Sequence, residues 1–152
     1  MTQATPFRTG HIGLNVTDLN RSSKFYQDIF GFQEIKASHE EGREFAFLAD
    51  GDTLVLTLWK QSEGQFSPST PGLHHLSFQV NSIDDVRSAE GRVRSSGARL
   101  HHNGIVPHAE GAQSGGIFFE DPDGTRLEIF TATGADEASA PNAGGAPTCG
   151  FF

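Results

Sequence analysis

An internal repeat constrains the fold of this chain more than any other feature of its sequence. Residues 11–19 and 75–83 both begin with His, carry a side-chain amide four residues later and a Val directly after it, and end in an aliphatic residue. Each stretch leads into a predicted helix that stops at a glycine, Gly31 or Gly97, and then into short strands. The sequence therefore predicts an α+β fold built from two βαβββ modules of about 60 residues that together form a cupped mixed sheet.

The predicted elements follow from alternation, helix caps and turn residues. For the first module we expect strands over 10–16, 32–37, 43–48 and 53–59, with a helix that begins at Asp18 or Asn20 and ends at Phe30. For the second we expect a helix capped by Ser82, a short strand before a long loop over 103–116, and strands over 75–80, 117–120 and 125–131. We assign 1–134 to a single domain, with module one at 9–60, a linker at 61–72 and module two at 73–132, followed by an Ala/Gly/Pro-rich tail at 135–152.

The charge and composition of the chain limit the classes of partner that we expect it to bind. The 152 residues include 11 basic and 19 acidic side chains, a formal net charge of −8, with no Lys/Arg cluster to offset it. Nucleic acid and anionic membrane surfaces are therefore excluded as expected partners. No leader or run of roughly 18 apolar residues is visible, so we expect a cytoplasmic protein. The lone Cys149 excludes an intramolecular disulfide and a multi-cysteine metal site.

Three side chains carry the predicted chemistry. Alternation along the first strand of each module places His11 and His75 on the concave side of the sheet, and Glu128 of the last strand faces the same side. Two neutral imidazoles and one carboxylate form the facial set that binds a divalent metal and leaves coordination positions open. Fe(II) fits this set first, while Mn(II), Zn(II), Ni(II) or Co(II) are also compatible. Leu56 is the residue that we match to Glu128 in the first module.

The remaining histidines are interpreted separately, because a histidine on a strand is commonly a packed or solvated residue. His74 and His75 alternate, so only one of them points into the cleft. His101 and His102 are expected to be surface residues. His108, in the predicted long loop, is a candidate for proton transfer or for substrate contact.

These residues also carry a family resemblance. The stretch HIGLNVTDL from His11, together with FGF at 30–32 and DPDGTRLE ending at Glu128, resembles the vicinal oxygen chelate superfamily over residues 9–132. That superfamily includes glyoxalase I, extradiol ring-cleaving dioxygenases, fosfomycin-resistance thiol transferases and bleomycin-resistance proteins. The resemblance implies paired βαβββ modules around a metal, often in a homodimer, with His11, His75 and Glu128 at the ligand positions.

Departures from each branch narrow the expected activity. Glyoxalase I enzymes have a fourth ligand, Glu, at the position matched here to Leu56. Extradiol dioxygenases use the three-ligand set but carry Tyr where this chain has Phe118, and only His108 is near the spacing of their loop histidine. Fosfomycin transferases also place a Tyr at Phe118. Bleomycin-type binding proteins usually lack the ligands that this chain has.

The sequence thus predicts a metal-dependent enzyme, a dioxygenase or lyase most like the extradiol dioxygenase and glyoxalase branch. Its substrate is expected to be a small organic molecule that chelates the metal through vicinal oxygens, and its assembly is expected to be a homodimer. The alternative is a non-catalytic binding protein of the bleomycin-resistance type. We also expect the apolar residues 149–152 to dock their two Phe side chains onto this subunit or a partner.

Overall fold

A computed structural model describes residues 2–142 and 145–151. The chain divides into two compact units: Met1–Gln27 with Gly31–Glu63, and Asp28–Phe30 with Gly64–Phe152. Each unit contains one four-stranded mixed sheet and is described by itself. This pair of βαβββ modules confirms the predicted α+β fold class.

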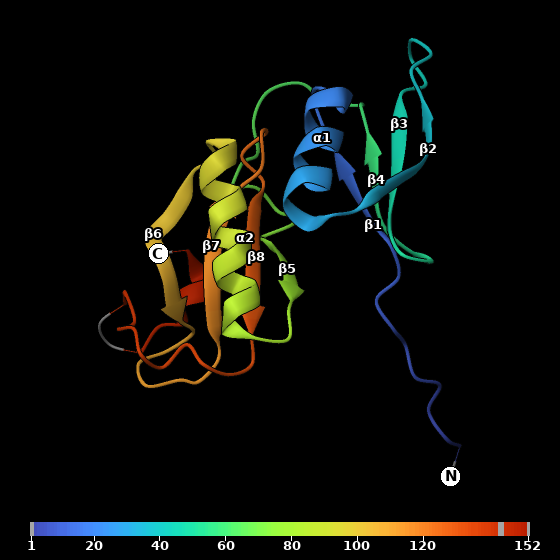
Figure 1. The fold of residues 1–152 in the computed structure, drawn as a ribbon. Coiled ribbons are helices and arrows are strands. Elements are labelled where there is room, and N and C mark those ends of the chain that lie inside the picture. Colours follow the sequence, from blue (N-terminus) through green and yellow to red (C-terminus); the bar gives the residue numbers. More distant parts are fainter. Residues whose placement is uncertain (1, 143–144, 152) are drawn as a thin grey trace. The chain divides into compact units, whose positions relative to one another are not determined.

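The first unit holds one copy of the repeat except for Asp28–Phe30, the end of its helix. Its elements are β1 (Ile12–Asn15), α1 (Leu19–Phe30), β2 (Gln33–Ser38), β3 (Phe45–Asp50) and β4 (Thr53–Trp59). The sheet order is β1-β4-β3-β2, with β1 parallel to β4 and the other pairs antiparallel. Helix α1 covers one face of this sheet (Figure 1).

Helix α1 begins and ends where its caps predict. The Asp18 carboxylate accepts a hydrogen bond from the Arg21 backbone N–H, and Gly31 adopts the left-handed conformation with φ 73°. Tyr26 on the helix and Leu56 and Leu58 on β4 are fully buried. The helix is thus held by apolar burial between itself and the sheet.

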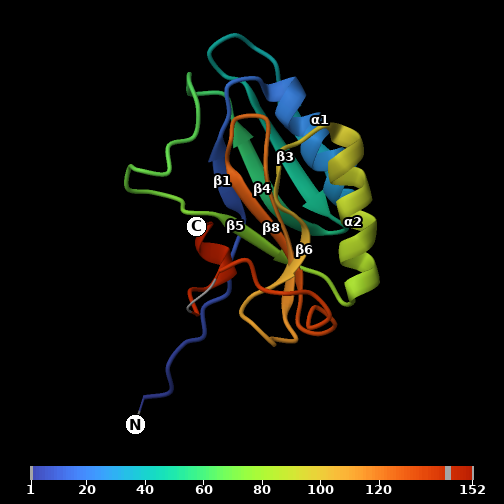
Figure 2. The same ribbon diagram turned by 90° about the vertical axis from the view of Figure 1, so that its left-hand side faces the viewer.

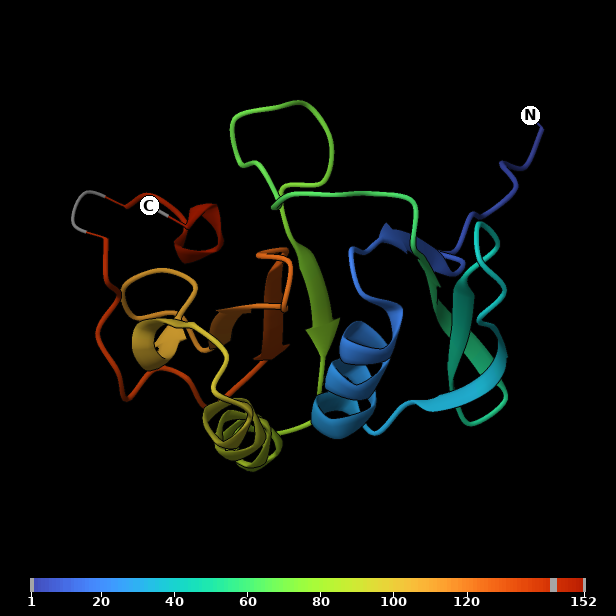
Figure 3. The ribbon, with the colours of Figure 1, turned by 90° about the horizontal axis from the view of Figure 1, so that it is seen from above.

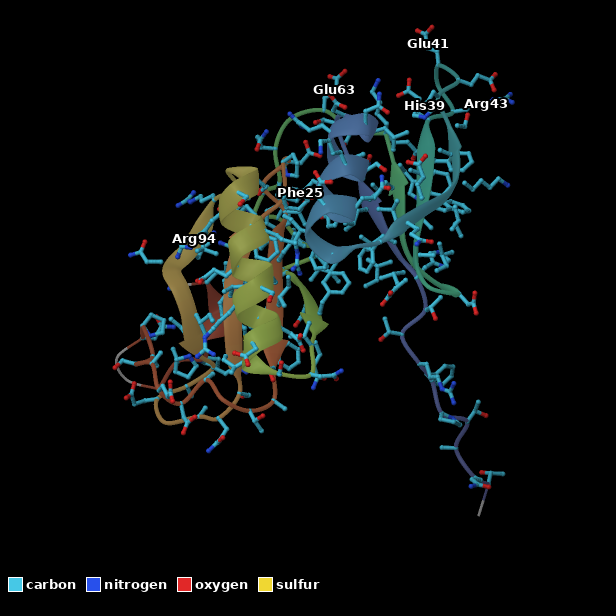
Figure 4. The ribbon with its side chains drawn as sticks, viewed as in Figure 1. Phe25, His39, Glu41, Arg43, Glu63 and Arg94 are labelled. Atoms are coloured by element: carbon cyan, nitrogen blue, oxygen red, sulfur yellow. The ribbon has the colours of Figure 1, made fainter. Side chains whose placement is uncertain are left out.

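The connection between β2 and β3 is a solvent-exposed hairpin. Its tip carries His39, Glu41 and Arg43, whose side chains point away from the sheet (Figure 4). The turn is closed by a hydrogen bond from the Arg43 backbone N–H to the Glu40 carbonyl. No part of this hairpin contributes to the sites considered below.

The second unit repeats the topology. Its elements are β5 (Leu76–Gln79), α2 (Ile83–Ser96), β6 (Leu100–Pro107), β7 (Gly115–Glu120), β8 (Arg126–Thr131) and the short 3-10 helix η1 (Thr148–Gly150). The sheet order is β5-β8-β7-β6, again with the first pair parallel. Ser82 caps α2 and Gly97 ends it, as predicted. None of the described helices has the length and apolar character needed to cross a membrane.

The predicted loop over 103–116 is wrong in its first part. Strand β6 continues to Pro107, and β7 already begins at Gly115. The Asn103-Gly104 pair suggested a loop, but the strand absorbs it as an irregularity in register between His101 and Val106. His102 and Asn103 have φ values of 58° and 60° there, which is the local distortion that a bulge requires.

The C-terminal segment folds back onto the second unit. Buried Thr148 donates its backbone N–H to the His108 carbonyl and its hydroxyl to the Pro107 carbonyl. Figures 2 and 3 show η1 on the face of the second sheet opposite α2. The expected docking is confirmed for Phe151, which contacts rings of its own chain, while Phe152 lies outside the described residues.

Candidate functional site

Glu128 is the centre of the polar cluster in the second unit. It lies in β8 between buried Leu127 and Ile129 and is itself only 3% exposed. One carboxylate oxygen accepts the Ser77 hydroxyl at 2.6 Å, and the other lies 2.6 Å from Nε2 of His108. Ser77 is the register partner of Glu128 across the parallel β5–β8 pair, so backbone pairing alone brings these two side chains together.

Glu128 is held in its charged form. Burial by itself would raise the pKa of this carboxyl, but the hydrogen bonds from His108 and Ser77 and the nearby imidazoles outweigh burial and lower it. A buried carboxylate that stays ionised needs partners of positive character. This is the electrostatic setting in which a cation or an imidazolium is bound favourably.

His75 lies directly before β5, beside Glu128. Its Nε2 is 3.8 Å from the nearer Glu128 oxygen, and its Nδ1 lies 2.8 Å from Nδ1 of His74. Burial lowers the pKa of His75 despite the attraction of Glu128, so the neutral imidazole is favoured. The neutral form is the one that ligates metals, and the contact through Nδ1 orients Nε2.

The role of His74 was missed by sequence reasoning. Strict alternation along a strand would place the side chains of His74 and His75 on opposite faces. These two histidines precede β5, where alternation does not hold, and their ring centroids lie 5.0 Å apart. The sequence feature that could have indicated this role of His74 was the His-His pair itself.

His108 is fixed by contacts on several sides. Its Nδ1 lies 2.9 Å from the Ser114 hydroxyl, its backbone N–H bonds to the Ser114 carbonyl, and its own carbonyl accepts from Thr148. The ring packs 5.3 Å from Phe130. The structure thus brings His108 to Glu128, from a position just beyond β6.

The interpretation of His101 and His102 as surface residues is wrong, because both are partly buried. Nε2 of His101 lies 2.7 Å from a carboxylate oxygen of Glu120, and its ring lies 5.1 Å from Phe151. His102 packs edge-on against Phe118 at 5.7 Å. The longer β6 explains both placements, since it carries these side chains into the sheet.

His11 belongs to the first unit, where it directly precedes β1. The second unit therefore brings together two of the three predicted ligands, His75 and Glu128. Within residues 2–142 and 145–151 the structure contains no group of three or more His, Cys, Asp or Glu able to hold a metal ion. The three-residue set stays a prediction.

The match between Leu56 and Glu128 is corrected by the strand register. Glu128 pairs with Ser77, two residues after His75, whereas the residue two after His11 is Gly13, which pairs with Thr57. Thr57 is therefore the counterpart of Glu128, and Leu56 is the counterpart of buried Leu127. The Thr57 hydroxyl accepts the Trp59 indole N–H at 2.9 Å, and this position supplies no carboxylate.

Comparison with known protein families identifies the family of this chain. The profile of the Glyoxalase/Bleomycin resistance protein/Dioxygenase superfamily matches residues 8–129, which spans both modules. The chain belongs to this superfamily. The vicinal oxygen chelate resemblance is thereby confirmed.

Three relatives in the superfamily illustrate its range. The chain is 29% identical over 140 residues to a trivalent organoarsenical cleaving enzyme of Bacillus sp. (strain MD1), covering 91% of this chain and 80% of that one. It is 27% identical over 125 residues to a manganese-dependent 2,3-dihydroxybiphenyl 1,2-dioxygenase of Geobacillus genomosp. 3, covering 80% of this chain but only 35% of that protein. A glyoxylase/bleomycin resistance protein/dioxygenase domain from Frankia sp. EAN1pec matches with a TM-score of 0.69 at 27% identity, covering 84% and 98% of the two chains.

Proposed function

We propose that this superfamily member is a metal-dependent enzyme, most like the extradiol dioxygenase and glyoxalase branch. In this proposal His11, His75 and Glu128 hold a divalent ion, with Fe(II) favoured, and a small organic substrate chelates it through vicinal oxygens. His108 serves as the proton-transfer group. The observation that carries the proposal is the buried Glu128 carboxylate with Nε2 of His75 3.8 Å from its nearer oxygen.

The residues of the second unit fit one side of such a metal site. An imidazole nitrogen and a carboxylate oxygen 3.8 Å apart are donors that iron, manganese and zinc accept. His74 contacts the ring of His75, and Ser77 donates a hydrogen bond to Glu128. Residues around metal ligands commonly orient the ligands in this way. A bound ion would supply Lewis acidity toward the substrate oxygens and, if redox-active, access to oxygen chemistry.

His108 is suited to move a proton at Nε2. Ser114 fixes its Nδ1, so Nε2 is the nitrogen that faces Glu128. In this proposal a substrate hydroxyl replaces Glu128 as the partner of Nε2. The imidazole then keeps its own hydrogen on Nδ1, toward Ser114, so Nε2 can accept the hydroxyl proton and return it to the product.

The substrate class is best tested with a small panel. Relatives of this chain are named for cleaving a trivalent organoarsenical and for opening a dihydroxybiphenyl ring. We therefore include a catechol, a trivalent organoarsenical, a methylglyoxal–thiol adduct and fosfomycin, each assayed with Fe(II)- and Mn(II)-reconstituted protein. Ring-cleavage absorbance on the catechol, with no turnover of fosfomycin, is the expected outcome.

Metal analysis decides between the enzyme and the alternative, a non-catalytic binding protein. Protein purified without chelators is expected to contain close to one metal ion per chain. Less than about 0.2 ion per chain, unrestored by added Fe(II), Mn(II) or Zn(II), favours the binding protein and rejects the enzyme.

The substitution Glu128→Gln tests the ligand assignment. It keeps the shape of the side chain but removes the only charged donor, so metal affinity is expected to fall by at least about tenfold. Glu120→Gln is the matched control, because Glu120 also pairs with a histidine in the same sheet. Equal metal content in both variants would remove Glu128 from the site.

A homodimer is part of the same proposal, and the three donors give it a direct test. His11 and the pair His75–Glu128 belong to different units, so donors can be supplied by one chain or by two. Mixing His11→Ala protein with Glu128→Gln protein restores metal binding only if two chains share a site. A cytoplasmic location stays a prediction.

A further inference from the structure

Arg126 is a cation next to the proposed site, and it has no carboxylate partner among residues 2–142 and 145–151. It lies in β8 two residues before Glu128, so both side chains leave the strand on the same face. Among the described residues no carboxylate lies within ion-pair distance of Arg126: the Glu128 oxygens are engaged by Ser77 and His108, and Glu120 is engaged by His101 and Arg99. Arg126 as a residue is partly buried.

Within the part of the chain that the structure describes, this guanidinium contacts an aromatic ring. The Arg126 Cζ atom lies over the Phe151 ring, 5.0 Å from its centroid. A guanidinium that rests on a ring has one face covered, but the N–H groups around its edge stay in the plane and free to donate. That edge is the part of arginine that binds a carboxylate in a two-pronged arrangement.

Phe151 is held in place by its own segment. Thr148 anchors η1 through two hydrogen bonds, and the left-handed φ of 58° at Phe151 follows directly after it. The ring lies 5.3 Å from Phe118 and 5.6 Å from His75, the predicted metal ligand. Arg126, Phe151 and His75 therefore adjoin one another on one sheet face.

We propose that Arg126 and Phe151 form an anion subsite that selects a planar aromatic carboxylate. The guanidinium edge binds the carboxylate, and the ring of Phe151, which is partly exposed, packs against the aromatic body. The inference rests on the proposed function only for the identity of the neighbouring reactive centre; the subsite itself needs no metal. It assigns the substrate class as an anionic arene rather than a neutral one.

The test compares two non-chelating probes, benzoate and benzamide, which differ in charge but little in shape. Binding to the full chain as purified is measured by calorimetry at low ionic strength. Wild type is expected to bind benzoate about tenfold or more tightly than benzamide, as a charge-assisted two-pronged contact implies. Arg126→Gln is expected to abolish this preference, and Arg126→Lys to retain only part of it.

Two further variants make the result specific. Arg87→Gln removes the same charge from an exposed pair with Asp84 on α2, so it controls for net charge and is expected to leave the preference unchanged. Phe151→Leu keeps apolar volume but removes the ring, and is expected to weaken both probes by a similar factor. Loss of preference in Arg87→Gln, or wild-type preference in Arg126→Gln, would overturn the proposal, as would the absence of benzoate binding to wild type.

Metal content of each variant separates this inference from the proposed function. Arg126→Gln is expected to keep the metal content of wild type. A wild-type chain that prefers benzoate but binds no metal rejects the enzyme and leaves the subsite standing. A wild-type chain that binds metal but shows no preference for benzoate rejects the subsite and leaves the metal-dependent enzyme standing.

Discussion

Nε2 of His108 lies 2.6 Å from a carboxylate oxygen of Glu128, and this contact joins the residue after β6 to the middle of β8. The two side chains are 20 positions apart in the sequence. The contact fixes the buried Glu128 carboxylate in a single orientation on this face of the second sheet. It is the part of the candidate site that mutagenesis can address most directly.

His108→Gln is expected to lower turnover of the substrate identified from the panel by about 10² to 10⁴-fold while metal content stays near that of wild type. Glutamine keeps a donor toward Glu128 but cannot accept and return a proton. The measurement is kcat alongside elemental analysis. His101→Gln, which removes the other imidazole–carboxylate contact, is the control, and equal losses in both variants would assign a merely structural role to His108.

Thr148→Val is expected to destabilise the protein by about 1–2 kcal/mol, because the Pro107 carbonyl loses its buried donor. Urea unfolding measures the change. Thr133→Val, at an exposed position in the same part of the chain, is the control and is expected to change stability by less than about 0.5 kcal/mol. Identical midpoints for the two variants would show that the C-terminal anchor contributes nothing.

Glycine substitutions give a pair of opposite outcomes. A Cβ at Gly116 would meet the backbone of Ile129 and Phe130 on the adjacent strand, so Gly116→Ala is expected to cost about 4 kcal/mol or more, or to prevent folding. At Gly91, in the exposed interior of α2, a Cβ meets nothing within 4 Å, and Gly91→Ala is expected to stabilise by about 0.5–1 kcal/mol. Chemical denaturation compares them. A tolerated Ala at Gly116 would contradict the close pairing of β7 with β8.

His102 is expected to lower the free energy of unfolding at acidic pH. Burial lowers the pKa of His102 below its ordinary 6.5, so on acidification the unfolded chain takes up this proton before the folded chain does. The stabilising contribution of neutral His102 is therefore complete above pH 6.5 and decreases as the pH drops from there toward the pKa of His102 in the folded state. Below that pKa the contribution is lost completely.

His102→Asn tests this contribution, since asparagine tolerates the positive φ at this position. The difference in unfolding free energy between about pH 8 and about pH 5.5 is expected to be smaller in the variant than in wild type. His39→Asn, on the exposed hairpin tip, is expected to retain the wild-type difference. A variant that keeps the full difference would exclude His102 as its source.

The fold was predictable because its signals are local. Asp18, Ser82, Gly31 and Gly97 bound the two helices where capping chemistry places them, and alternation located most strands. Strand β6 was underestimated because Asn103 and Gly104 are typical of loops, whereas here pairing with β7 on both sides of them keeps the strand intact. Tertiary pairing outweighed local preference at this point.

The site was predictable in residue type but not in detail. Glu128 and His75 meet as the repeat indicates, but matching the modules by sequence placed Leu56 one residue from the true counterpart of Glu128. A period of two makes such a slip change the face on which a side chain lies, and only hydrogen-bond register reveals it. The contacts of Phe151 depend on where η1 is anchored, which no local pattern encodes.

The anchoring of Thr148 has a practical consequence for handling this protein. Phe151 lies against His75 and Arg126, so a polyhistidine tag fused close to it can bring extra imidazoles to the predicted ligands and distort metal measurements. Residues 2–10 are exposed and form no strand or helix, so a removable tag belongs at that end.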